Sequence, residues 1–145
     1  EREPRGYHTI PGDRELAYRG DPETGEPMDG YGHEHHIWNV DKVRAYIANR
    51  DERDTFFCGG SRNSSMFIDL LDGVFVLEVG LDVMNRRIAE RVARDPTDFG
   101  ATPEERELIA RLHATRESVP TVATRIDADA PIARIFIFFA STRLL

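Results

Sequence analysis

The 145-residue sequence holds one cysteine, one tryptophan and no long apolar run. The single cysteine, Cys58, excludes a disulfide within the chain and suits a reducing compartment. No apolar run approaches the roughly 18 residues that a membrane-spanning helix needs. The first residues also lack the charged, apolar and small-residue parts of a signal peptide. We therefore expect a cytoplasmic location and no membrane partner.

Positive charge is scarce relative to negative charge, and the formal net charge is −7. Such a chain repels a nucleic-acid backbone unless basic side chains gather in one patch, so we expect no nucleic-acid partner. Arginine accounts for all the basic residues except Lys42. Genome base composition is one explanation of this bias. Bidentate binding of phosphate or carboxylate by individual arginines is the other.

Short apolar segments with strand character alternate with segments of helical periodicity. Strands are expected at 7–10, 55–58, 74–79 and 121–126, and helices at 40–47, 66–71, 81–92, 102–112 and 129–139. This alternation is typical of an α/β fold with a mostly parallel sheet and helices on both faces. We predict one domain over residues 1–145, with an irregular loop at 11–36.

Two helix starts carry their own capping residues. Asn39 precedes the apolar periodicity of 40–47 and is a suitable N-cap. Thr102 is followed by Pro103 in the first turn and by Glu105, which completes a capping box.

A polar, glycine-rich loop follows the strand predicted at 55–58. Ligands of parallel α/β sheets bind beyond the carboxyl ends of the strands, where paired glycines let the backbone approach a ligand. Polar side chains at the start of a following helix favour an anion. The alternative is a plain turn in which one residue caps that helix. The candidate substrate-binding residues are Gly59, Gly60, Ser61, Arg62 and Asn63.

Asp13 lies just after the first predicted strand. A carboxylate there can hold or deprotonate a substrate hydroxyl, or can simply satisfy its own turn. Arg87, Arg91 and Arg94 share a helical face that leads into the loop 95–100. Arginines beside a loop stabilise charge in phosphoryl transfer, and the alternative is a solvated helix face.

The segment His33-Glu34-His35-His36 is dense in metal-ligating side chains. Its spacing does not match the helical His-Glu-x-x-His pattern of zinc proteases, so we expect no metal site. A polar loop that covers a ligand is the favoured interpretation. Cys58 lies in an apolar run and is expected to be a buried structural thiol.

The order of these features resembles that of the P-loop kinases of the shikimate, adenylate and nucleoside kinase type, including small bacterial AAA-like ATP-binding proteins. The stretches 55–63, 74–94 and 98–105 carry the resemblance. It implies a three-layer P-loop kinase-like architecture with a lid-like segment at 95–118. It also implies ATP and Mg²⁺ as cofactors and phosphoryl transfer to a small molecule such as a nucleoside or nucleotide.

The resemblance also implies roles for individual residues. Asp13 matches the substrate-binding acid, and the Gly59–Arg62 loop matches the acceptor side. Arg91 and Arg94 match the first lid arginines and, with Asp13, form the candidate catalytic set. Asp127 and Pro131 lie where relatives contact the adenine of the cofactor.

One departure from the family concerns the phosphate-binding loop. The sequence has no Gly-x-x-x-x-Gly-Lys-Ser/Thr motif, and the family's first strand and phosphate loop would come before Glu1. We therefore expect impaired use of ATP. The absent strand predicts either a gap or a new pairing between strands 55–58 and 74–79, and an unfilled edge would favour a homo-oligomer. The alternative function is a non-catalytic module that binds a small anion, a nucleoside or a protein.

Overall fold

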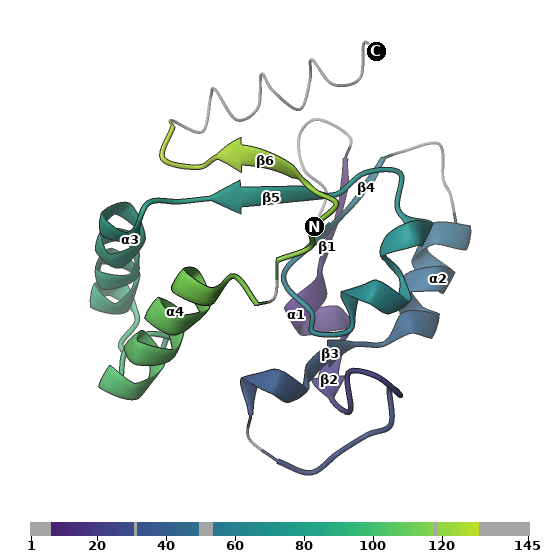
Figure 1. The fold of residues 1–145 in the computed structure, drawn as a ribbon, viewed down its shortest axis with the longest axis horizontal. Helices are drawn as coiled ribbons and strands as arrows, with labels where there is room; N and C mark the ends of the chain where they lie inside the picture. Colours follow the sequence, from purple (N-terminus) through teal and green to yellow (C-terminus); the bar gives the residue numbers. More distant parts are fainter. Residues whose placement is uncertain (1–6, 31, 50–53, 118, 131–145) are drawn as a thin grey trace. The chain divides into compact units, whose positions relative to one another are not determined.

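The computed structural model describes residues 7–30, 32–49, 54–117 and 119–130 (Figure 1). The chain divides into two compact units, Glu1–Asp72 and Gly73–Leu145. Each unit is described by itself, and the single domain expected over 1–145 stays a prediction. The C-terminal part of the helix expected at 129–139, including Pro131, lies outside the described residues.

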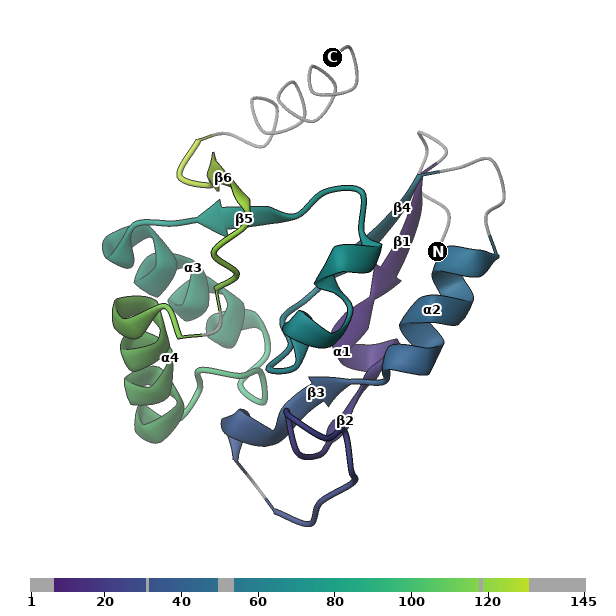
Figure 2. The ribbon, with the colours of Figure 1, turned by 45° about the vertical axis from the view of Figure 1, so that its right-hand side comes forward.

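The first unit is built on a parallel pair of strands. Its elements are β1 (His8–Pro11), α1 (Gly12–Glu15), β2 (Ala17–Arg19), β3 (His36–Trp38), α2 (Val40–Ala48) and β4 (Thr55–Cys58), with 3₁₀ turns η1 (His33–His35), η2 (Ser64–Met66) and η3 (Ile68–Leu70). β1 runs parallel to β4, and α2 lies beside this pair (Figure 2). β2 pairs with β3 in antiparallel fashion. The segment 11–36, expected to be irregular, thus contains α1, β2 and η1.

The second unit repeats the parallel pairing. Its elements are β5 (Phe75–Glu78), α3 (Leu81–Arg94), α4 (Pro103–Thr115) and β6 (Thr124–Asp127). β5 runs parallel to β6, with Glu78 opposite Asp127. The expected strands 74–79 and 121–126 and the helices 81–92 and 102–112 are confirmed, with their ends moved by a few residues.

The structure is therefore of mixed α/β type, with small parallel sheets and helices. Each sheet among the described residues has two strands. β4 belongs to the first unit and β5 to the second, so the expected gap or new pairing between these two strands stays a prediction. Self-association through an open strand edge stays a prediction.

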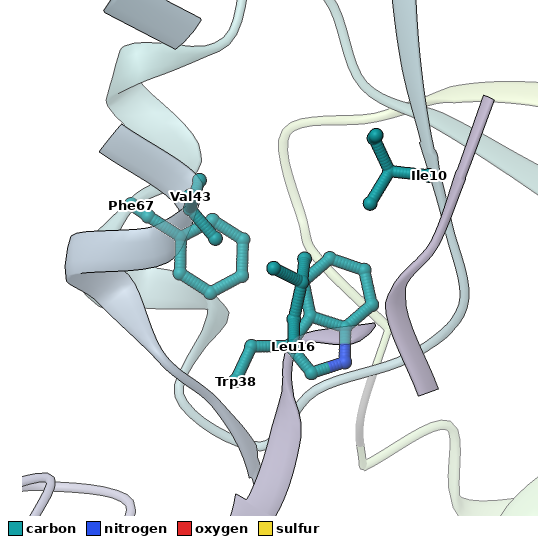
Figure 3. Packing of buried hydrophobic residues seen from close by; sticks show 5 residues of the cluster. All are labelled: Ile10, Leu16, Trp38, Val43 and Phe67. Atoms are coloured by element: carbon teal, nitrogen blue, oxygen red, sulfur yellow. The ribbon is translucent and has the colours of Figure 1, made fainter. Parts of the chain in front are cut away.

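A cluster of buried side chains holds the first unit together. It comprises Ile10, Leu16, Trp38, Val43 and Phe67 (Figure 3). The rings of Trp38 and Phe67 lie nearly parallel, with centroids 5.6 Å apart and planes 8° from parallel. Because Trp38 is only 4% exposed, its large ring fixes the spacing of the elements around it.

The helix predicted at 66–71 is wrong, because the two 3₁₀ turns η2 and η3 occupy this segment. The backbone changes course at Phe67, whose φ of −141° is far from helical. That bend is where the Phe67 ring enters the core against Trp38. Core packing therefore overrides the helical spacing of the apolar residues.

Both predicted helix caps are confirmed. The Asn39 side chain accepts a hydrogen bond from the Lys42 amide at 2.9 Å and caps α2. At α4, Thr102 Oγ1 accepts from the Glu105 amide, and Glu105 Oε2 accepts from the amides of Thr102 and Gly100. These backbone hydrogen bonds, first from Thr102 and then from Gly100, hold the pKa of the Glu105 carboxyl below its ordinary value.

This lowered pKa predicts that the Glu105 carboxylate stabilises the second unit in a pH-dependent way. Its contribution is complete above the unfolded pKa of about 4.3 and is lost as the pH falls through the lower folded pKa. Glu105→Gln keeps a side-chain oxygen for the cap but removes the charge. Urea unfolding followed by circular dichroism should show wild type as the more stable protein at neutral pH and the two as equal in strong acid. A difference that persists unchanged in acid would contradict this prediction.

Candidate functional site

Two chain segments meet at the carboxyl ends of β1 and β4. Because these strands run parallel with Pro11 opposite Cys58, the residues that follow them emerge at the same edge. A Cβ atom built on Gly59 would lie 2.8 Å from Asp13 Oδ1 and 2.9 Å from Trp38 Cζ2. Gly59 also has a φ of +143°, which side-chain-bearing residues rarely adopt. The sequence-predicted residues Asp13 and Gly59 therefore lie in contact.

His36 completes this arrangement from β3. Its Nε2 atom lies 3.1 Å from Asp13 Oδ1, and the two side chains are 35% and 57% exposed. The contact is an ion pair when the imidazole is protonated and a hydrogen bond from the neutral imidazole to the carboxylate otherwise. His36 was expected only as part of a covering loop, and its contact with Asp13 is a structural feature that the sequence did not indicate.

The backbone beside this pair borders open space. A Cβ atom built on Gly60 would have no heavy atom within 4 Å. The neighbouring carboxylate of Asp13 is more than half exposed. The Gly60 backbone and the Asp13 carboxylate are therefore both accessible from solvent.

Ser61 and Asn63 turn inward and support the loop. Asn63 is completely buried, its Nδ2 donates to the Trp38 carbonyl at 2.9 Å, and its Oδ1 accepts from the Trp38 amide at 3.0 Å. Ser61 Oγ accepts from the same amide at 3.1 Å. The alternative in which the Asn63 side chain caps the next helix is wrong, since no cap hydrogen bond forms.

Arg62 joins the loop to β3 through its backbone. Its amide donates to the His36 carbonyl at 3.0 Å, and its side chain is half-buried. His36, the histidine partner of Asp13, is thus anchored through its carbonyl by the same loop that supplies Gly59. The loop 59–63 therefore serves mainly to support the site, and it offers few side chains to a ligand.

The predicted arginines belong to the second unit. Arg91 Nη2 donates to the Phe99 carbonyl at 2.6 Å, and Arg91 Nε lies 2.7 Å from Asp98 Oδ2, so this side chain holds the loop that follows α3. Arg94 is the exposed last residue of α3. Arg87 Nη2 donates to the Ala128 carbonyl at 2.8 Å. A role for Arg91 and Arg94 in catalysis with Asp13 stays a prediction.

The remaining candidate residues are Asp127 and Cys58. Asp127 accepts a hydrogen bond from the Asp129 amide at 2.9 Å, which closes a local turn after β6. Cys58 is exposed, so the prediction of a buried thiol is wrong, although partial burial raises the pKa of the thiol above its ordinary value. A raised pKa makes the thiolate rare at neutral pH and the residue a poor nucleophile.

Among the residues that the structure describes, no three histidine, cysteine or acidic side chains are grouped so that they could hold a metal ion. None of the described helices combines the length and the apolar character needed to cross a membrane.

Comparisons of the chain with family profiles, with curated proteins and with solved structures gave no match. The functional interpretation therefore depends on the geometry of the Asp13–His36 site.

Proposed function

We propose that the first unit binds a hydroxyl-bearing small molecule at Asp13, as the acceptor side of a domain related to ATP-dependent phosphotransferases. The observation that carries this proposal is the contact of Asp13 with His36 and Gly59 beyond the ends of two parallel strands. This is the edge at which ligands of parallel α/β sheets bind.

The chemistry of the pair suits a hydroxyl ligand. His36 contacts Asp13 Oδ1, which leaves Oδ2 to accept a hydrogen bond from a ligand. An aspartate in that position orients the hydroxyl and can accept its proton when the oxygen becomes a nucleophile. The imidazole holds the carboxylate in one orientation, so less conformational freedom is lost on binding.

The described residues do not fit ATP and Mg²⁺. Phosphate loops use glycine-rich backbone and a lysine, and the only lysine of this sequence, Lys42, donates to the Glu15 carbonyl at 3.3 Å. We therefore propose acceptor binding for this chain and derive no transfer step. The three-layer kinase-like architecture belongs to the same proposal, and the parallel pairs β1–β4 and β5–β6 support it.

Exchange of the Asp13 carboxylate for an amide tests the proposal. Nucleosides, nucleotides and sugar phosphates are screened by thermal shift, and each hit is titrated by calorimetry against wild type and Asp13→Asn. We expect at least one hydroxyl-bearing hit, because a ligand that binds the native state raises its stability. Asp13→Asn should weaken its binding about tenfold or more, as expected for loss of a charged hydrogen-bond acceptor.

The matched control is Asp69→Asn, which removes an exposed carboxylate from η3 of the same unit. It should bind like wild type, which separates a local effect from a change in net charge. A panel without any hit, or equal affinity of wild type and Asp13→Asn, would contradict the proposed function.

A further inference from the structure

Two histidine rings lie parallel to each other, and one of them, His36, contacts Asp13. His33 and His36 are three residues apart, and the His36 amide donates to the His33 carbonyl to close the 3₁₀ turn η1. Side chains three residues apart eclipse one another in a 3₁₀ turn. The planes of the two imidazoles are accordingly only 2° from parallel. This short turn therefore aligns two flat rings at the edge of the site.

The faces of these rings are incompletely covered by one another. Their centroids lie 6.3 Å apart, whereas carbon atoms in direct contact lie about 3.5 to 4 Å apart. The contact of His36 Nε2 with Asp13 uses the edge of the imidazole and fixes its orientation without occupying its face. The His36 side chain is 35% exposed, so part of it is accessible from solvent.

We propose that His33 and His36 bind the planar ring of the ligand whose hydroxyl contacts Asp13. The ligand is then an alcohol that carries a flat heteroaromatic ring, as a nucleoside does. This inference depends on the proposed function, because Asp13 supplies the hydroxyl contact. Stacking of a base on an aromatic side chain typically strengthens binding by about tenfold or more, and every base has a face for it.

The surrounding charges favour a neutral ring over an anion. The carboxylate of Asp13 lies 3.1 Å from His36, and the carboxylate of Glu34 lies 4.0 Å from His35 Nε2. Two acidic groups beside the histidines repel a phosphate. A metal ion is not favoured either, because the described residues do not gather a third ligand around the pair.

The experiment compares adenosine and uridine with D-ribose by calorimetric titration of the 145-residue chain. The variants are His33→Ala, which removes the second ring, and His33→Phe, which restores a flat ring without its nitrogens. The control is His8→Ala, which removes an exposed histidine of β1. Circular dichroism checks that each variant is folded.

We expect a nucleoside to bind wild type about tenfold more tightly than D-ribose. His33→Ala should abolish this preference, while His33→Phe and His8→Ala should keep it. Equal binding of nucleoside and ribose to wild type, with both weakened by Asp13→Asn, would overturn the ring-binding role and leave the proposed function intact. Unchanged nucleoside affinity in His33→Ala would also overturn it. If adenosine, uridine and D-ribose all fail to bind, the ring-binding role of His33 and His36 is overturned. The proposal that the hydroxyl-bearing ligand is a nucleoside is then overturned as well.

Discussion

Replacement of Gly12 by alanine should strongly destabilise the first unit, whereas the same replacement at Gly60 should leave its stability nearly unchanged. A Cβ atom on Gly12 would lie 2.5 Å from Cη2 and 2.6 Å from Cε2 of Trp38. The indole cannot withdraw, because it is 4% exposed and packs in parallel against Phe67. Overpacking of this kind costs about 3 kcal/mol when the neighbour is fixed. Gly60 has no atom within 4 Å of such a Cβ.

Trp38 is the only tryptophan of the chain, so its fluorescence reports the unfolding of the first unit. Urea titrations of wild type, Gly12→Ala and Gly60→Ala should give a large loss for Gly12→Ala alone. The comparison is well matched, because each change adds one methyl group to a glycine of the same unit. Equal midpoints for Gly12→Ala and wild type would show that the indole does not fill the space beside α1.

Replacement of Asn63 by alanine is the second large change that we expect. The Asn63 side chain satisfies both the amide and the carbonyl of Trp38, and it is completely buried. Alanine would leave the Trp38 carbonyl without this donor and would open a small cavity. A buried polar group without its partner costs about 1 to 3 kcal/mol, so the free energy of unfolding should fall by about 3 kcal/mol.

Ser61→Ala is the matched control for this loop. The Trp38 amide is shared between Ser61 Oγ and Asn63 Oδ1, so it keeps one acceptor when the serine hydroxyl is removed. Ser61 Oγ also donates to Asn63 Oδ1 at 2.5 Å, so the loss should be about 1 to 2 kcal/mol, the typical net value of two hydrogen bonds. Urea unfolding followed by Trp38 fluorescence measures both variants. An Asn63→Ala loss no larger than that of Ser61→Ala would contradict the supporting role of Asn63.

Elements with strong local signals could be predicted from the sequence. β4 occupies the predicted residues 55–58, where an apolar run ends at a glycine pair. α4 begins after Thr102, because the capping box is encoded within four residues. Asp13 and Gly59 could be expected at one edge, because parallel strands present their carboxyl ends together.

Features that depend on contacts distant in sequence could not be predicted. The pair β2–β3 joins strands of three residues each, which are too short to show a periodicity of their own. The contact between His36 and Asp13 spans 23 residues and leaves no mark in local spacing. Asn63 is polar and follows a glycine pair, so its sequence position suggests a cap, whereas tertiary packing buries it under Trp38.

Arg91 illustrates why residue type alone did not establish a role. Its position near a loop is typical of an arginine that stabilises a phosphoryl group, but its guanidinium contacts Asp98 and the Phe99 carbonyl. Arginine carries several hydrogen-bond donors in a rigid fork. This geometry binds the carboxylate and carbonyl groups of a loop as well as it binds a phosphate. The acceptor site is therefore better supported than the arginine set.

The most direct test of the Asp13 site is an NMR titration of the isotope-labelled chain with adenosine, followed through the backbone amide signals. We predict that the signals of Asp13, His36, Gly59 and Gly60 shift together with one dissociation constant, and that Asp13→Asn raises this dissociation constant about tenfold or more. Shifts that occur elsewhere while these four signals stay fixed, or an unchanged dissociation constant in Asp13→Asn, would contradict the assignment of this edge as the binding site.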